Sequence, residues 1–431
     1  MPRRSLSFAS LLAAALTAGA CDDVSLPSNV NPPPGGGSGA DAGSGGGGGS
    51  DVGAAKPTPP VGLVVVNSDF MSTSISLLDG STGQVTKGDC IDSGTRPPGS
   101  TPALSSDVVV PSAPQPGNPV LLIDRKNAAL TWLDPATCMP THQLDVSTGF
   151  AANPHDVIGL STTKAYVMRY DPSPNDAGAG DDILIIDPSV PAITGRIDLS
   201  SFVVPVSGAV MKARPDHARL INGNVFVSLN ELSDDFFSGV GHGRVIEIDP
   251  ATDQVVATID IPELADCVEM SYVEASQTLV VVCTGDFTAA DPTLTSGIAY
   301  IDVSASPPVE VLHQTAAAFA GRALSSYSGI AQNGALGFAV TPGVFGTTPH
   351  DRLWSFNVAS GQATPVTDAS DSFVYGTVLV DPDHLRVYLT DGFASTPRVQ
   401  IYDYTSGTAV HQAAIEADAA SGLPPREIAR Y

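Results

Sequence analysis

One motif recurs seven times along the chain and constrains its fold more than any other feature of the sequence. In each copy a short apolar stretch ends in Asp or Asn and a small polar turn follows; these residues are Asp79, Asp134, Asp187, Asp249, Asp302, Asn357 and Asp403. Successive copies are 55, 53, 62, 53, 55 and 46 residues apart. A short polar side chain at this position accepts hydrogen bonds from backbone N–H groups two residues on, which fixes a tight turn. The motif therefore indicates an array of seven similar units.

Four short strands surround each motif, and two units show them clearly. They span residues 156–160, 164–169, 182–186 and 193–199 in the third unit, and 213–221, 224–229, 243–248 and 254–261 in the fourth. Second strands such as 63–66, 120–123 and 279–282 are apolar throughout, as expected for strands buried on both faces between stacked sheets. Seven such units predict an all-β fold, a seven-bladed β-propeller of four-stranded antiparallel blades over residues 61–431.

The two ends of the repeat region predict how the ring closes. The first unit begins at Val61 directly with its second strand, and residues 424–431 follow the seventh unit as a single additional strand. We therefore expect the C-terminal strand to become the innermost strand of the first blade. This pairing removes an open sheet edge that would otherwise promote aggregation.

Two stretches resemble a known group of propellers. The sequence from Ile248 to Ile259, Ile-Asp-Pro-Ala-Thr-Asp-Gln-Val-Val-Ala-Thr-Ile, and the segment Asn153-Pro-His-Asp-Val157 are similar to YVTN-type repeats. The group includes lactonase-like proteins and bacterial surface and periplasmic proteins. The resemblance covers residues 61–431 and implies the propeller fold. For activity it implies a hydrolase with calcium or another divalent ion bound at the face that carries the long loops.

The N-terminus reads as an export signal followed by a tether. Arg3 and Arg4 precede an apolar run at residues 6–16, and small residues follow at 17–20, so residues 1–20 are predicted to be a signal peptide. Residues 18–21, Ala-Gly-Ala-Cys, resemble a bacterial lipobox, which implies lipidation of Cys21 and attachment to a membrane. An ordinary signal peptide with an incidental cysteine is the alternative. Residues 21–60 are rich in Gly, Pro and Ser and are predicted to be a disordered, lipid-anchored linker.

The composition excludes some functions. Hydrophobic residues make up 42% of the chain, which rules out wholesale disorder. The 45 acidic and 20 basic residues give a net charge of -25. Nucleic acid is therefore not an expected partner, because binding a phosphate backbone needs a positive surface.

Four cysteines remain after Cys21, and an exported protein meets an oxidising environment. Cys267 and Cys283 flank a predicted hairpin in nearly opposed positions, so we expect them to form a disulfide. By elimination, Cys90 and Cys138 are expected to pair between the first two blades. The chain has no Cys-x-x-Cys, so neither a Cys-pair zinc site nor an attached c-type haem is indicated.

The long loops all fall on one predicted face of the ring. They join second to third strands at residues 171–181, 231–242, 285–296, 342–350 and 391–397. Two of them are acidic, and their candidate metal-ligating residues are Asp171, Asp176, Asp181, Asp182, Glu231, Asp234 and Asp235. Clustered carboxylates are ligands for calcium. Solvated carboxylates on unconstrained loops are the alternative explanation.

Histidines are the other candidates for chemistry. His155 with Asp156, and His217 with Asp216, open innermost strands near the axis of the predicted ring, and His242 and His350 lie on the long-loop face. Imidazoles beside carboxylates can bind a metal ion or move protons. The chain has no His-Glu-x-x-His and no Gly-x-Ser-x-Gly, so structural histidines are the alternative at each position.

No complete catalytic constellation is visible in the sequence. We therefore expect a non-catalytic scaffold, lipid-anchored at the cell envelope in the periplasm or on the outer-membrane surface. It would present the long-loop face to a protein or glycan partner. The alternative, implied by the resemblance, is a divalent-ion-dependent, lactonase-like hydrolase. No cofactor is expected, and Ca²⁺ is the candidate ion.

Overall fold

The computed structural model describes residues 61–96, 102–175, 179–325, 331–333, 336–393 and 395–431. The predicted signal peptide, Cys21 and the linker of residues 21–60 lie outside the described residues. None of the described residues belongs to a helix with the length and apolar character needed to cross a membrane.

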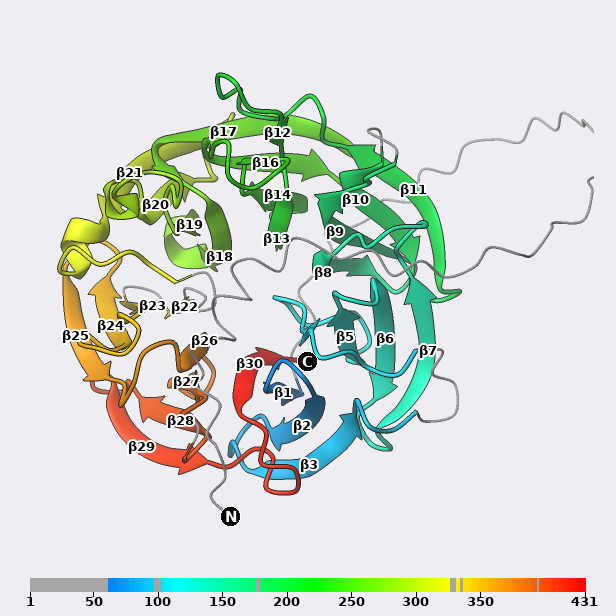
Figure 1. Cartoon of the computed structure of the whole chain (residues 1–431), viewed down its shortest axis with the longest axis vertical. Helices are drawn as coiled ribbons and strands as arrows, with labels where there is room; N and C mark the ends of the chain where they lie inside the picture. The colour runs from blue at the N-terminus through cyan, green and yellow to red at the C-terminus, as the bar shows by residue number, and fades with distance from the viewer. Residues whose placement is uncertain (1–60, 97–101, 176–178, 326–330, 334–335, 394) are drawn as a thin grey trace, which may run out of the picture. The chain divides into compact units, whose positions relative to one another are not determined.

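Seven four-stranded sheets, the blades, follow one another around a common axis in the described part of the chain (Figure 1). The strands within each blade are antiparallel, and the blades are numbered here in chain order. This architecture confirms the predicted seven-bladed propeller.

The strands of each blade run from the axis to the rim with the following bounds. Blade 1 consists of β30 (Pro425–Arg430), β1 (Gly62–Ser68), β2 (Thr73–Asp79) and β3 (Val85–Asp92). Blade 2 consists of β4 (Val108–Val109), β5 (Val120–Asp124), β6 (Ala129–Asp134) and β7 (Met139–Asp145). Blade 3 consists of β8 (Pro154–Ser161), β9 (Lys164–Pro172), β10 (Gly180–Asp187) and β11 (Ala192–Asp198). Blade 4 consists of β13 (Pro215–Ile221), β14 (Asn224–Leu229), β16 (His242–Asp249) and β17 (Gln254–Ala265).

The remaining blades have the same plan. Blade 5 consists of β18 (Cys267–Val273), β19 (Thr278–Cys283), β20 (Gly297–Asp302) and β21 (Val309–Thr315). Blade 6 consists of β22 (Ala331–Asn333), β23 (Leu336–Thr341), β24 (Arg352–Asn357) and β25 (Ala363–Asp368). Blade 7 consists of β26 (Tyr375–Asp381), β27 (Arg386–Asp391), β28 (Arg398–Asp403) and β29 (Val410–Ile415). Outside the blades lie the paired strands β12 (Met211–Lys212) and β15 (Leu232–Ser233), and the 3-10 helices η1 (Glu274–Ser276), η2 (Pro292–Leu294) and η3 (Ala316–Phe319).

The recurring Asp or Asn forms the turn between the third and fourth strands, as predicted. In all seven copies its Oδ1 accepts a hydrogen bond from the backbone N–H two residues on, at 2.8 to 3.1 Å. In six blades the register of the outer hairpin also shifts between the second and the first residue before the turn Asp. Such a β-bulge bends its strand and increases the local twist. The sequence motif therefore encodes a turn and a bend together.

The hydrophobic core is divided among the contacts between blades. Seven clusters of buried side chains lie in the described residues, and each cluster joins two neighbouring blades. Trp132 packs between blades 2 and 3, and Trp354 packs between blades 5 and 6. Both side chains are buried, as their strand positions predict. Each blade is thus stabilised by its two neighbours, including the pair formed by blades 7 and 1.

The C-terminal strand closes the ring, which confirms the prediction (Figure 1). β30 pairs with β1, and the backbone N–H of Val61 donates to the carbonyl of Tyr431 at 2.6 Å. Ile428 is buried in the cluster between blades 7 and 1. The carbonyl of Arg426 also accepts a hydrogen bond from Oγ1 of Thr390 in blade 7, at 3.0 Å. One short strand therefore connects the first and last blades.

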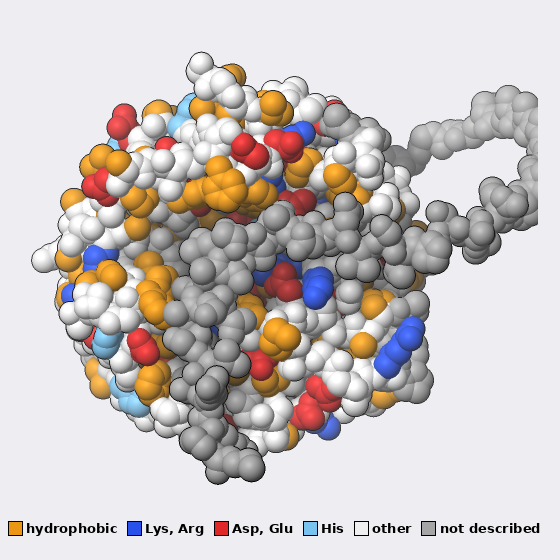
Figure 2. Space-filling model, viewed as in Figure 1, with side chains coloured by type: hydrophobic (Ala, Val, Ile, Leu, Met, Phe, Trp, Pro, Cys, Tyr) orange, Lys and Arg blue, Asp and Glu red, His pale blue; other side chains and the backbone are white. Residues whose placement is uncertain are grey.

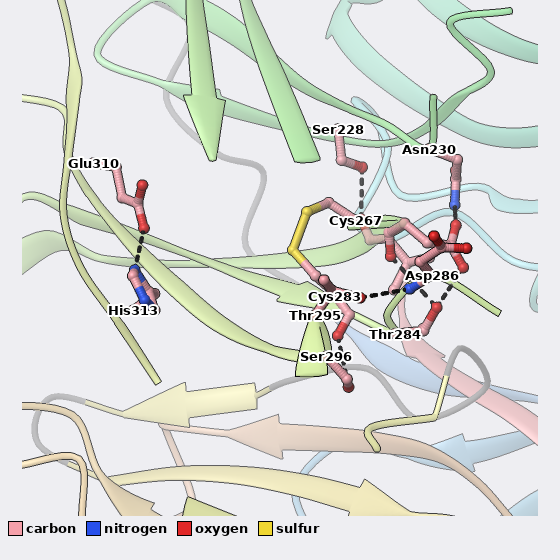
Figure 3. The surroundings of a disulfide bond; sticks show 12 residues. Ser228, Asn230, Cys267, Cys283, Thr284, Asp286, Thr295, Ser296, Glu310 and His313 are labelled. Carbon is pink, nitrogen blue, oxygen red and sulfur yellow. Dashed lines mark hydrogen bonds and ion pairs between the residues drawn. A yellow bond between two sulfur atoms is a disulfide. The ribbon is translucent and has the colours of Figure 1, made fainter. Parts of the chain in front are cut away.

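Both predicted disulfides form. Cys90 and Cys138 join β3 to the turn before β7, and Cys267 and Cys283 lie directly opposite each other on β18 and β19. Figure 3 shows the second disulfide at the end of its blade, beside a hydrogen bond from Oγ of Ser296 to the carbonyl of Cys283 at 3.1 Å. This disulfide fixes the end of the innermost strand of blade 5.

Candidate functional site

The loops that join second to third strands, and the connections between blades, lie on one side of the ring, as predicted. We call this side the loop face. It is turned toward the viewer in Figure 1, where the loops cross in front of the strands. Every innermost strand begins at the loop face and runs away from it.

β-bulges at the start of the innermost strands set polar side chains around the axis. The register against the second strand shifts at the beginning of β8, β13, β18, β26 and β30. A bulge leaves a residue unpaired in the ladder and changes the direction of its side chain. His155 lies in the bulge of β8, Asp216 and His217 in that of β13, and Glu269 in that of β18. These four residues, contributed by three neighbouring blades, are called the axial cluster below.

Asp216 lies at the centre of the axial cluster. Its Oδ1 is 3.0 Å from Nδ1 of His155 and 2.8 Å from Nδ1 of His217. Nε2 of His217 lies 3.3 Å from Oε2 of Glu269. The other oxygen of Glu269 accepts a hydrogen bond from Nη2 of Arg219 at 2.5 Å. The sequence placed both histidines beside carboxylates, but the partner of His155 comes from the next blade and not from the adjacent Asp156.

Charge pairing outweighs burial in this cluster. Burial alone would raise the pKa of Asp216, but the two imidazoles hold that pKa far below its usual range. Burial alone would lower the pKa of His217, but Glu269 and Asp216 raise it to about 10. His217 is therefore an imidazolium at neutral pH, and it links two carboxylates.

His155 is the member of the cluster that is suited to proton transfer. We assign a proton to its Nδ1, because that atom faces the carboxylate of Asp216, and this leaves a lone pair on Nε2. No described residue hydrogen-bonds Nε2 of His155. The imidazole stacks on the ring of Tyr170, with centroids 4.0 Å apart and planes inclined by 5°. The guanidinium of Arg214 lies over Tyr170 and over Phe236. The arrangement supplies an oriented base; hydrolysis would also need a nucleophile and donors for an oxyanion.

Two of the acidic candidates are paired with arginine. Asp182 is fully buried, and its two oxygens accept hydrogen bonds from Nε and Nη2 of Arg169, both at 2.7 Å. Nε of Arg196 lies 2.9 Å from the same carboxylate. Asp171 forms an ion pair with Nη1 of Arg214 at 2.7 Å. These carboxylates hold blade 3 and its loop together.

Asp181 and Glu231 are buried without a close cation. Asp181 accepts backbone hydrogen bonds from Ala213 at 3.2 Å and from Arg214 at 2.6 Å, and Glu231 accepts one from Val204 at 2.6 Å. Burial raises the pKa of Asp181 to about 7 and that of Glu231 to about 8. Both groups therefore bind a proton more tightly in the folded chain than in the unfolded chain.

The remaining acidic candidates lie elsewhere. Asp234 and Asp235 are exposed, and Asp235 accepts backbone hydrogen bonds from Phe237 and Ser238 within its own loop. Asp176 lies outside the described residues. In the described part of the chain, no group of three or more His, Cys, Asp or Glu side chains has an arrangement that would hold a metal ion. His242 lies 3.3 Å from Asp260, away from the axial cluster.

The raised pKa of Glu231 predicts a pH-dependent stability. The folded chain retains a proton that an unfolded glutamate, with a pKa near 4.5, releases, so this contribution is present below pH 4.5 and is lost as the pH rises through about 8. Glu231→Gln keeps an acceptor for the N–H of Val204 and removes the titration. The variant should match the parent at pH 5 and be more stable by about 2 kcal/mol at pH 8. Urea unfolding at both pH values measures this, and an equal pH dependence in both proteins would contradict it.

Large apolar side chains are exposed around the loop face. They come from loops of five blades and from two connections between blades; they are Met71, Val210, Phe237, Phe287, Leu294, Val344, Phe345 and Phe373. Leu294 and Phe237 retain 72% and 68% of their accessible surface. Figure 2 shows hydrophobic side chains in patches around this face, with acidic and basic side chains near the centre. The sequence located these loops but did not identify their apolar residues as a shared surface.

Glu269 and Arg214 were missed in the sequence because neither belongs to a recognisable motif. Glu269 follows the start of its innermost strand by two residues, as His217 does in the preceding blade. An alignment of the seven units on their innermost strands would have placed the two residues at the same position. Arg214 gives no comparable signal, because its role depends on two aromatic rings contributed by separate loops.

No protein family and no curated protein sequence matches the chain. Solved structures do match its fold. A putative 6-phosphogluconolactonase from Bacteroides fragilis has a TM-score of 0.55 and 11% identity, with 86% of this chain and 98% of that one covered. A putative 6-phosphogluconolactonase from Bacteroides uniformis has a TM-score of 0.54 and 11% identity, covering 86% and 99%. A hypothetical selenium-binding protein from Sulfolobus tokodaii has a TM-score of 0.54 and 11% identity, covering 86% and 94%. Likeness at this level of identity concerns the propeller fold alone.

Proposed function

We propose that this protein is a non-catalytic binding propeller of the cell envelope that engages a protein partner through its loop face. The observation that carries the proposal is the set of exposed apolar side chains on that face. Monomeric proteins rarely gather exposed apolar residues on one side, and such surfaces typically mark sites of protein association. Loops on a rigid scaffold are also where binding residues concentrate.

A protein fits this surface better than a glycan. Tryptophan is the side chain best suited to stack on a sugar, and both tryptophans of this chain are buried between blades. The apolar residues of the loop face are phenylalanine and aliphatic side chains, which pack against similar groups of a protein. The net charge of -25 favours a partner with basic residues around its apolar contact surface.

The attachment at the envelope is part of the same proposal. A lipid on Cys21, followed by the linker of residues 21–60, would hold the propeller near a membrane while leaving the loop face accessible. Mass spectrometry of the N-terminal peptide from the mature protein checks this part, because the peptide should begin at Cys21 and carry the lipid. A peptide that begins elsewhere and lacks the lipid would remove the anchor from the proposal.

The function is tested with a variant of the apolar surface. Phe237→Ser with Phe345→Ser should leave stability within about 0.5 kcal/mol, because both side chains are exposed. The same change should weaken capture of the partner from envelope extract at least about tenfold, since exposed aromatics dominate such contacts. Val309→Ser with Val311→Ser is the matched control, because these exposed residues lie on the rim strand β21. The captured protein is then purified and titrated against all three forms; equal affinities would contradict the proposal.

A lactonase-like hydrolase is the second candidate, and the pairing of His155 with Asp216 favours it. The carboxylate orients the imidazole so that Nε2 can accept a proton from an attacking water. Turnover of a lactone by the purified protein, abolished by His155→Gln and retained by His411→Gln on the rim strand β29, would support this candidate. Absence of turnover in the parent protein would remove it.

A further inference from the structure

A pocket of 710 Å³ opens on the loop face where blades 1 and 2 meet. Its walls come from the β1–β2 loop, the end of β3, the β3–β4 connection, the β5–β6 turn and the β29–β30 connection. We call it the blade 1–2 pocket. Neither the axial cluster nor the sequence motifs account for it.

An additional β-bulge shapes one wall of this pocket. The register between β2 and β3 pairs Ile75 with Ile91 but Leu77 with Lys87, so β3 has two extra residues here. This shift is separate from the bulge that recurs in the outer hairpins. It sets Asp89 on the pocket wall, directly before Cys90, which the disulfide ties to Cys138 in blade 2. The wall is therefore built by a bulge and held by a covalent link between blades.

The described walls carry more negative than positive charge. Asp89 and Asp92 line the pocket, and Lys126 is the single cation among its described lining residues. Asp89 forms no ion pair or hydrogen bond with any described residue. One oxygen of Asp92 accepts a hydrogen bond from the backbone N–H of Gly94 at 2.6 Å, which leaves its second oxygen available.

Two further carboxylates lie behind the walls. Asp418 is 2% exposed and accepts hydrogen bonds from the hydroxyls of Ser74 and Ser421, both of which line the pocket. Asp124, also 2% exposed, accepts hydrogen bonds from the lining residues Ser105 and Asn127. Neither carboxylate forms an ion pair among the described residues, so their charge adds to the negative potential of the pocket. Burial, together with Asp92 and Asp418, raises the pKa of Asp89.

The pocket also contains an unused buried hydroxyl. Thr73 lines it, is fully buried, and its Oγ1 has no hydrogen-bond partner. Such a group costs free energy unless a partner satisfies it. The hydroxyls of Ser72 and Ser106 line the same space and form no hydrogen bond with a described residue. These oxygens are acceptors for a ligand that brings hydrogen-bond donors.

We propose that the blade 1–2 pocket binds a primary ammonium group, held by Asp89 and Asp92 and by hydroxyls of the pocket wall. An ammonium brings a positive charge and three donors, which match carboxylate and hydroxyl acceptors at a site that is open to solvent. A metal ion fits less well, because the described residues provide no group of three ligands arranged for one. A sugar would supply donors without the charge that the carboxylates call for.

The ammonium can come from two sources. A free polyamine would bind the pocket by itself. A lysine side chain of the partner would bind it during docking, and this second source rests on the proposed function, since the pocket and the apolar residues share the loop face. Met71, which lines the pocket and keeps 74% of its accessible surface, belongs to both.

Calorimetric titration of the full chain in detergent tests the proposal with two probes, spermidine and the blocked tripeptide acetyl-Gly-Lys-Gly-amide. Asp89→Asn with Asp92→Asn removes the two charges and keeps the acceptor for Gly94. Glu263→Gln with Glu274→Gln is the control, because these exposed residues lie in blades 4 and 5 and change the net charge equally. Lys126→Ala removes the cation of the pocket wall. Thermal unfolding of each variant confirms that it is folded.

The parent protein should bind at least one probe at a single site. The Asp89 and Asp92 variant should bind it at least about tenfold more weakly, the control should stay within about twofold, and Lys126→Ala should bind about threefold more tightly. Binding of spermidine alone identifies a free polyamine, and binding of the tripeptide alone identifies a lysine side chain. Binding of neither probe, or an equal loss in the control, overturns the proposal. None of these titrations uses the partner, so their result is independent of capture by Phe237 and Phe345.

Discussion

Deletion of residues 424–431 is expected to abolish the cooperative folding of the propeller. The deletion removes β30, exposes the edge of β1 and leaves the cluster between blades 7 and 1 without Ile428. Because each blade packs against two neighbours, loss of this interface opens the ring at one point and exposes apolar surface on both sides of the gap. We expect the truncated chain to aggregate and to lose its sharp thermal transition, measured by calorimetry and by size-exclusion chromatography.

A synthetic peptide of residues 424–431, added in excess, provides the control. It can pair with β1 as β30 does, so it should restore part of the thermal transition. A peptide with Asp at position 428 should fail, because the carboxylate would be buried where Ile428 is 2% exposed. A truncated chain that unfolds with the transition temperature of the full chain would show that β30 does not close the ring.

Arg169→Met should destabilise the fold by about 3–5 kcal/mol, the usual result of removing one partner from a buried ion pair. Arg169 is 1% exposed and Asp182 is fully buried. The guanidinium also donates to the carbonyls of Val146 and Ser147 at 3.2 and 3.3 Å, which ties the connection from blade 2 to blade 3. The variant leaves Asp182 with Arg196 as its remaining cation. Urea unfolding of the parent and the variant measures the difference.

Arg352→Met is the matched control for this prediction. Arg352 pairs with Asp368 through Nε at 2.5 Å, but both side chains reach solvent. Its loss should cost less than about 1 kcal/mol, because solvent screens an exposed pair. A double variant with Arg169→Met and Asp182→Asn should recover part of the stability, since no buried carboxylate then lacks its partner. Equal effects of the two arginine substitutions would contradict the argument from burial.

The fold was predictable because its signal is local and repeated. Each turn Asp and its following N–H lie two residues apart, so the sequence shows both members of the interaction, and seven copies at a period near 53 residues exclude chance. Ring closure followed from a missing first strand at Val61. The disulfides followed from opposed positions in one hairpin and from elimination for the other pair. None of these inferences required knowledge of which side chains meet across blades.

The candidate sites were less predictable because their contacts join different blades. His155 and Asp216 are 61 residues apart, and a one-residue bulge at the start of each strand decides that they meet. The blade 1–2 pocket depends on two extra residues in β3, and the sequence around Asp89 does not reveal them. The acidic loop residues were visible as a group, but the arginines that pair with Asp171 and Asp182 were not connected with them. Patterns along the chain show which loops are long, and the register of the strands determines what those loops bring together.

The place of β30 in blade 1 also orders the assembly of the molecule in time. A ribosome delivers the chain from its N-terminus, so strands β1 to β29 emerge before residues 425–430 do. During that interval the first blade has three strands, and its edge toward the axis is unpaired. The nascent polypeptide therefore remains an open arc until synthesis ends, and the finished ring is a state that only the released chain can reach.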